Sequence, residues 1–150
     1  MKNIEKGDVN LMRILKLIGI LSVVVTTLCF SAEKYENAIE FINQGKYKEA
    51  VSILEKLSTE KPDSIEIKFM LGVAYVHLQE YILAESCFND VLSKSPDYLL
   101  AHYYLAMIYE QRKMDIQAIN EWNKVVFLTK DKKLLELAKK HIKQLEIIKR

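Results

Sequence analysis

The residues that could carry chemistry are few and widely spaced. The candidate metal ligands and nucleophiles are the histidines and cysteines, at His77, His102, His141, Cys29 and Cys87. Zinc sites pair their ligands at about two to five residues, and a nucleophile needs a base beside it. No such pairing occurs in the sequence, and the four glycines form no phosphate-binding loop. We therefore expect no catalytic residue, no metal site, no cofactor and no enzyme activity.

Ordinary structural roles explain these side chains. Cys87 lies within a helical pattern and is expected to act as a small buried apolar residue. Cys29 lies in an apolar run that is expected to be removed, so no internal disulfide is predicted. His102 falls at a packing position of its predicted helix, whereas His141 falls on a polar face, and neither is expected to bind a ligand.

The composition is that of an ordinary globular chain. Of the 150 residues, 50% are hydrophobic and 28% are charged, while only four glycines and two prolines are available for tight turns. This composition favours helices throughout and predicts an all-α fold. The net charge of +2 resides in the segment 1–32, so the remainder is neutral. A neutral body lacks the positive field of a nucleic-acid-binding protein, and we expect no nucleic-acid partner.

The N-terminal part has the order of a secretory signal. Arg13 and Lys16 precede an uncharged run from Leu17 to Phe30, and the small residues Ser31 and Ala32 follow it. This run has 14 residues, which is short of the roughly 20 that span a bilayer as a helix. Residues 1–32 are therefore expected to be a cleaved signal peptide, and the mature protein to be periplasmic or secreted.

Three alternatives to this interpretation of the N-terminal part stay open. Met12 is a candidate start, because the stretch before it is polar and includes two acids. Retention of the Leu17 to Phe30 segment would instead anchor the protein in the inner membrane. Acylation of Cys29 is a minor alternative, because the residues before it fit a lipoprotein motif poorly.

A 34-residue period organises the rest of the chain. The stretches "KYKEAVSILEKL", "EYILAESCFNDV" and "MDIQAINEWNKV" begin at residues 46, 80 and 114. Each is preceded by a partner helix and a short polar link, which predicts helical hairpins at 31–64, 65–98 and 99–132. The small and large apolar positions of the repeat are Ala50, Ala84 and Ala118, then Leu54, Phe88 and Trp122, and in the partner helices Ala38, Gly72 and Ala106.

The C-terminal segment 133–150 has the pattern of a further amphipathic helix. It is expected to cap the stack, because a terminal helix must be apolar on one side and polar on the other. An alternative is that its basic side binds an anionic surface. The predicted apolar stripe consists of Leu134, Ala138, Ile142, Leu145 and Ile148.

The repeat positions resemble the tetratricopeptide repeat (TPR). The second unit is the best match, and it carries the motif residues Leu71, Gly72, Tyr75, Ala84, Phe88 and Pro96. The first unit has Asn37 where an apolar residue would stand, and the third has Lys130 where proline would stand. The resemblance implies a right-handed α-solenoid of three TPR-like hairpins, of a secreted or envelope-associated bacterial type.

The resemblance also implies a binding surface. TPR solenoids use a concave face lined by the first helix of each unit, and here its centre is expected at Phe69, Val73, Tyr103 and Met107, with Phe69 and Tyr103 projecting away from the core around Ala84 and Phe88. The positions where chaperone-binding members grip a C-terminal carboxylate are Tyr35, Ile39, Met70, Leu100 and Tyr104, so that clamp is not expected. The whole predicted groove is Tyr35, Ile39, Ile42, Phe69, Val73, Val76, His77, Tyr103, Met107 and Glu110.

The function expected is therefore that of a non-catalytic protein-protein interaction module outside the cytoplasm, which binds a peptide or helix in an apolar groove. Two alternatives stay open: a structural spacer tethered to the membrane through Leu17 to Phe30, and an accessory protein that binds a small apolar molecule. The apolar side chains of the groove can also pack against one another and leave no site.

Overall fold

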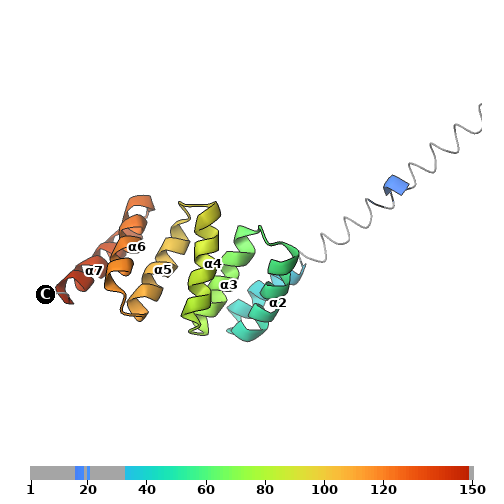
Figure 1. The fold of residues 1–150 in the computed structure, drawn as a ribbon, viewed down its shortest axis with the longest axis horizontal. Coiled ribbons are helices and arrows are strands. Elements are labelled where there is room, and N and C mark those ends of the chain that lie inside the picture. The colour runs from blue at the N-terminus through green and yellow to red at the C-terminus, as the bar shows by residue number, and fades with distance from the viewer. Residues whose placement is uncertain (1–15, 19, 21–32, 149–150) are drawn as a thin grey trace, which may run out of the picture.

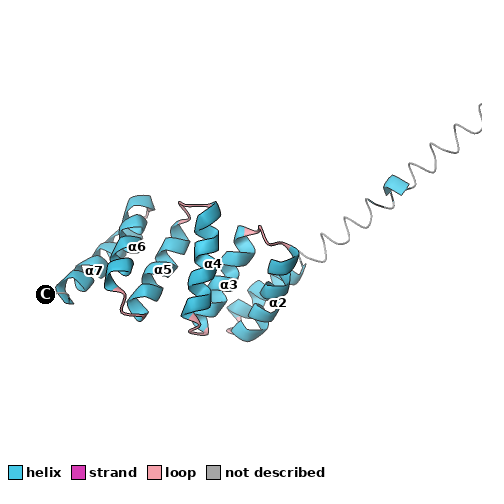
Figure 2. Cartoon of the chain, in the orientation of Figure 1, coloured by secondary structure: helices cyan, strands magenta, loops and turns pink. Residues whose placement is uncertain are grey.

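The computed structural model describes residues 16–18, 20 and 33–148. Within these residues every regular element is a helix (Figure 2). The first helix of the solenoid covers residues 33–43. The others are α2 (Tyr47–Glu60), α3 (Ile65–His77), α4 (Tyr81–Lys94), α5 (Leu99–Gln111), α6 (Asp115–Leu128) and α7 (Lys132–Ile148).

The helices form a row of antiparallel hairpins. From α2 onward each helix packs against the next one along the chain, and α3 also contacts α5. Figure 1 shows helix 33–43 and α2 at one end of the row and α6 and α7 at the other. The predicted all-α solenoid of three hairpins followed by a C-terminal helix is therefore confirmed.

The same backbone turn closes the first helix of every hairpin. Gly45, Gln79 and Lys113 recur with the period of the repeat and have positive φ angles of 74°, 63° and 59°. In each turn the positive-φ residue donates its N–H to the carbonyl three residues back, and the next residue donates to the carbonyl five residues back. This is the Schellman arrangement, which satisfies carbonyls that a helix end leaves free. Glycine is the residue that adopts such angles without strain, yet only the first turn uses it.

The predicted packing positions form the core. Ala50, Ala84 and Ala118 are fully buried, as are the large residues Leu54, Phe88 and Trp122. Gly72 approaches its partner helix so closely that an added Cβ would lie 2.9 Å from two ring carbons of Phe88. The small and large residues predicted from the period are thus the residues through which the two helices of each hairpin pack.

Position in the stack explains the irregular first unit. Asn37 stands where Leu71 and Leu105 stand in the later units, and those leucines are buried while Asn37 is exposed. In α3 and α5 these leucines lie on the side of the helix that faces the preceding unit. At the first helix, no unit among the described residues covers that side. A polar side chain is therefore suitable there.

The last helix begins one residue earlier than the period of the repeat requires. The starts of α3 and α5, at Ile65 and Leu99, are a full period apart, whereas α7 starts at Lys132 because residues 129–131 make a shorter link than 95–98. Ala138 of α7 is accordingly buried at the place of Leu105. Of the predicted stripe, Ala138 and Leu145 are buried, and Leu134 and Ile142 pack against them. The side chain of Ile148 lies outside the described residues.

Most of the predicted signal segment also lies outside the described residues, which include only Leu17, Ile18 and Ile20 of the apolar run. Within the described part of the chain, no helix has the length and hydropathy needed to cross a bilayer.

Candidate functional site

The residues predicted to line the groove lie on helix 33–43, α3 and α5, at matching places in the three hairpins. Their burial is uneven. Phe69 and Val73, in the middle unit, are only 9% and 7% exposed. The predicted residues of the first and third units are half-buried, as is Val76, and His77 is exposed. The accessible part of this face therefore lies toward the two ends of the row rather than at α3.

The expectation that Phe69 projects away from the Phe88 core is wrong. The ring of Phe69 lies 5.7 Å from that of Phe88, 5.1 Å from that of Tyr98 and 5.8 Å from that of Tyr104, measured between centroids. The rings of Phe88 and Tyr104 are stacked at 5.2 Å. These edge and offset contacts tie the second hairpin to the third. Phe69 thus contributes to the junction between units.

Tyr103 and Met107 stay partly exposed on α5. Tyr103 packs edge-on against Trp122 at 5.5 Å, and both Tyr103 and Met107 adjoin the cluster that α5, α6 and α7 bury together. Both side chains are held by packing and remain partly exposed, which suits a contact surface. A rigid aromatic side chain loses little conformational freedom when it binds. Tyr35 is similar at the other end, where burial, followed by the nearby charge of Glu66, raises the pKa of its hydroxyl.

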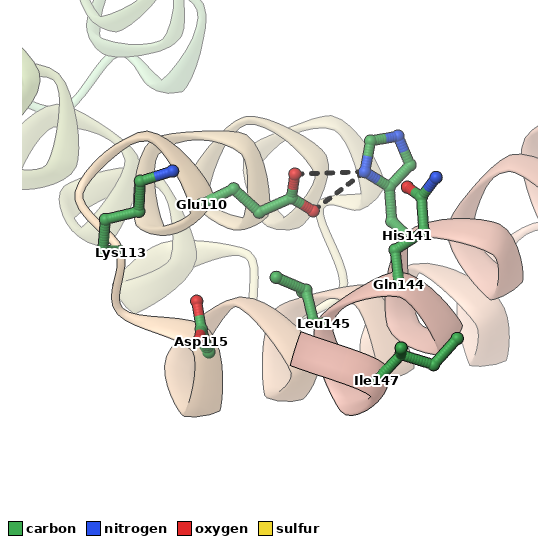
Figure 3. A pocket seen from close by; sticks show the side chains of 7 residues that line it. All are labelled: Glu110, Lys113, Asp115, His141, Gln144, Leu145 and Ile147. Atoms are coloured by element: carbon green, nitrogen blue, oxygen red, sulfur yellow. Dashed lines mark hydrogen bonds and ion pairs between the residues drawn. The ribbon is translucent and has the colours of Figure 1, made fainter. Parts of the chain in front are cut away.

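Side chains from α5, α6, α7 and the turn after α5 line a pocket of about 460 Å³ (Figure 3). Glu110 comes from α5, Lys113 from the turn after it, and His141 from α7. Leu145 and Ile147 give the pocket an apolar side. The full lining is Glu110, Lys113, Asp115, His141, Gln144, Leu145 and Ile147.

Glu110 is bonded rather than free. Its carboxylate accepts the indole N–H of Trp122, and His141 Nδ1 lies 2.9 and 3.1 Å from the two carboxylate oxygens. The imidazole also stacks on Trp122 at 4.7 Å. These contacts join α5, α6 and α7. The carboxylate that was predicted to face the groove thus helps to fix the last helix in place.

The placement of His141 on a polar face is wrong. Its side chain is partly buried and points toward Glu110 (Figure 3). The sequence contained the information needed to place it, because residue 141 lies three residues after Ala138 and four before Leu145, which are both buried.

The other candidate side chains have structural partners. His102 is 3% exposed, and its two ring nitrogens lie 2.6 Å from Glu121 Oε2 and 2.8 Å from the carbonyl of Pro96. Burial raises the pKa of the Cys87 thiol to about 11, which leaves it protonated and weakly nucleophilic at neutral pH. The exposed His77 stacks flat on Tyr47 at 4.3 Å.

No group of three or more histidine, cysteine, aspartate or glutamate residues is placed to hold a metal ion within residues 16–18, 20 and 33–148. What the described face offers is apolar and aromatic contact area on α5 and on helix 33–43, with a polar pocket beside α7. This arrangement can bind a chain or a small molecule, and it contains no base beside a nucleophile.

Comparison with characterised proteins gives partial matches in sequence. No protein-family model matches the chain. The chain is 28% identical over 96 residues to Superkiller complex protein 3 of Homo sapiens, covering 61% of this chain and 6% of that protein. It is 27% identical over 77 residues to Rhomboid protease GluP of Bacillus subtilis (strain 168), covering 51% of this chain and 15% of that protein. The chain thus spans a small part of the length of these relatives.

Solved structures match over most of the chain. The first TPR of Spaghetti (RPAP3), bound to the HSP90 peptide SRMEEVD, superposes with a TM-score of 0.71 at 19% identity and covers 79% of this chain and 91% of that one. The Yersinia enterocolitica type III secretion chaperone SycD, in complex with a peptide of the translocator YopD, has a TM-score of 0.74 at 15% identity. This match covers 79% of this chain and 94% of the SycD chain. MamA has a TM-score of 0.64 at 19% identity, and the match covers 77% of this chain and 75% of the MamA chain. Residues 33–148 therefore have the tetratricopeptide-repeat fold that the motif resemblance implied.

Proposed function

We propose that this chain is a non-catalytic protein-interaction module that holds a peptide or a short helix against the inner face of its first helices. The observation that carries the proposal is the half-exposed apolar row on helix 33–43 and α5, which Tyr35, Ile39, Tyr103 and Met107 represent. Aromatic anchors with buried bases are the residues that dominate binding energy at protein interfaces. Two solenoids of similar fold, RPAP3 and SycD, were solved with bound peptides.

The burial pattern supports Tyr103 and Met107 as the main contact in this proposal. Phe69 and Val73 have little surface left to offer, so they support the face from beneath rather than contact the partner. Met107 can adapt to side chains of different shape, since a thioether chain is flexible and polarisable. Ile42, Val76, His77 and Glu110 would form the edge of the contact.

We further propose that the module works outside the cytoplasm, in the periplasm or after secretion. The support is the order of Arg13, Lys16 and the apolar run Leu17 to Phe30. N-terminal sequencing of the fractionated protein tests this proposal. A chain that begins near Ala32 or Glu33 supports it, whereas membrane protein that retains Leu17 to Phe30 supports the tethered spacer.

Site-specific crosslinking tests the binding proposal. A photo-reactive residue at Met107 in the full chain should form covalent adducts with a protein partner in living cells, which mass spectrometry would identify. The same residue at the exposed Asn120 of α6 is the matched control. Tyr103→Ala should then weaken binding of the identified partner by at least about tenfold, as expected for an anchor residue.

Two results would contradict the proposal. Equal crosslinking from residues 107 and 120 would remove the inner face as the site. A small apolar molecule retained by the purified protein and lost in Tyr103→Ala, with no protein adduct, would favour the accessory ligand-binding role instead.

A further inference from the structure

The N-terminal end of the solenoid is acidic where the internal units are apolar. Ile67, Leu71 and Ala74 of α3 are buried. At the same places in the repeat, the first helix has Glu33, Asn37 and Glu40, all exposed. The third unit is apolar there too, with Ala101, Leu105 and Ile108 buried. The face through which an inner unit meets its predecessor thus carries glutamates in the first unit.

A fourth side chain extends this acidic end. Glu36 is exposed and aligns with Met70 of α3. Lys34 is directed elsewhere, since its ammonium lies 3.2 Å from Glu60 of α2. Glu40 accepts a bond from Gln44 of the following turn, which leaves its negative charge in place. We call Glu33, Glu36, Asn37 and Glu40 the acidic end.

The C-terminal end of the solenoid is basic. Because α7 begins one residue early relative to the period, Lys139 stands at the place of Ala106 and Gly72, the small residues that let the second helix of a hairpin approach. Its side chain is 54% exposed. Lys132 and Lys143 lie seven residues before it and four after it, on the same stripe of the helix, and both are exposed.

Acidic side chains reduce this positive charge without cancelling it. Glu136 lies 3.6 Å from Lys139, and Glu146 is exposed near the end of the helix. The remaining neighbours on this flank are Leu135 and Ile142, both half-buried. We call Lys132, Lys139 and Lys143 the basic end.

We propose that these two ends bind one another between copies, so that the protein associates head to tail with a second copy of itself. The acidic end of one molecule meets the basic end of the next and continues the row of helices. The charges of the acidic end and the basic end are complementary, and among the described residues neither end is covered by a further helix. Contact between two identical ends is disfavoured, because it would bring like charges together.

The association has two physical properties that make it testable. It is heterologous, so it adds copies in a line unless the rotation between copies closes a ring. It also depends on exposed charges, which salt screens over about 10 Å at 0.1 M and over about 3 Å at 1 M. It is therefore weak, concentration-dependent and lost in high salt, and it does not depend on any occupant of the inner face.

Sedimentation velocity of the full chain tests the proposal. We expect the sedimentation coefficient to rise with protein concentration at low salt and to return to the monomer value at high salt. Association through the apolar run Leu17 to Phe30 would instead persist at high salt, because salt does not weaken apolar contact. The salt response therefore separates the two sources of self-association.

Charge-reversal variants locate the contact. Glu36→Lys with Glu40→Lys should abolish the association, and so should Lys139→Glu with Lys143→Glu. The four substitutions combined in one chain should restore it, as should mixing the two double variants. Lys61→Glu with Lys94→Glu, two exposed positions in the middle of the row, changes the net charge as much as the second variant does and should leave the association intact.

Circular dichroism confirms that each variant is folded before it is compared. Failure of the combined variant to recover association would overturn the proposal. So would a loss of association in the mid-row control equal to that in the end variants, because the effect would then follow net charge alone. Absence of any salt-sensitive association up to the solubility limit would overturn it as well.

Discussion

Gly72→Ala sets two effects of opposite sign against each other. Gly72 lies inside α3, where alanine is the better helix former by about 1 kcal/mol. Without tertiary contacts the substitution would therefore stabilise the protein. The structure predicts the reverse, because the new methyl group would enter the space occupied by Phe88.

The distances determine which effect wins. The added Cβ would lie 2.9 Å from Phe88 Cε1 and Cζ and 3.2 Å from the Cβ of Cys87. Phe88 is fully buried, with Phe69 tilted against it and Tyr104 stacked on it, so its ring has no free space into which to turn. Overpacking of a filled core costs about 1 to 3 kcal/mol. After the gain in helix propensity, a net loss of about 1 kcal/mol in the free energy of unfolding is expected, or roughly 4 °C in Tm.

The first hairpin suggests the matched control. It pairs Ala38 with Leu54 at the places of Gly72 and Phe88, and both are fully buried. Phe88→Leu alone should cost about 1 kcal/mol through lost ring contacts. In the double variant the new methyl group at position 72 would face leucine, so its combined cost should fall below the sum of the two single costs by about 1 kcal/mol.

Denaturant unfolding followed by far-UV circular dichroism measures all four proteins of this cycle. If Gly72→Ala raised the unfolding midpoint, helix propensity would have won and the described contact with Phe88 would be wrong. Additive costs in the double variant would show that the two positions do not share a packing constraint.

Further predictions concern the turns, the buried thiol and the hairpin core. Lys113→Gly should raise stability by about 0.5 to 1 kcal/mol because glycine removes the strain of a φ angle of 59°, and Lys113→Ala should give no such gain in the same denaturant titration. Stability should decline from about pH 9 upward, since the thiol of Cys87 ionises in the unfolded chain first while burial holds its native pKa near 11. Unfolding midpoints measured against pH should decline less steeply for Cys87→Ala, and an unchanged slope would contradict this cause. Ala84→Glu should cost several kcal/mol because it buries a charge in a helix crossing, so an unaltered thermal melt would refute the register of the repeat.

The sequence by itself determined the fold because its information is periodic. Three stretches at 34-residue spacing fix which residue of each helix meets its partner, and the small and large apolar positions then follow from helix geometry. The burial of Ala84, Phe88 and Trp122 agrees with that alignment. The chain also has few turn-forming residues, which left no competing class of fold.

Only the tertiary structure decided which residues of the predicted inner face are accessible. The 34-residue period makes Phe69 and Tyr103 equivalent positions. Phe69 is nevertheless covered by Tyr98, in the link before α5, and by Tyr104 of the next unit, whereas Tyr103 packs edge-on against Trp122 and stays half-buried. Burial depends on the neighbours on both sides of a unit, and a pattern within one unit does not contain them.

The sequence pattern also could not predict which side chains the last helix exposes. A one-residue difference in the link before α7 turns His141 toward Glu110 and places Lys139 where the inner units have alanine or glycine. A helix rotates by about 100° per residue, so a shift of one residue changes which face each side chain occupies. The sequence determined that a final helix exists, and its packing against α6 decided what that helix presents to the groove, to the pocket and to the end of the solenoid.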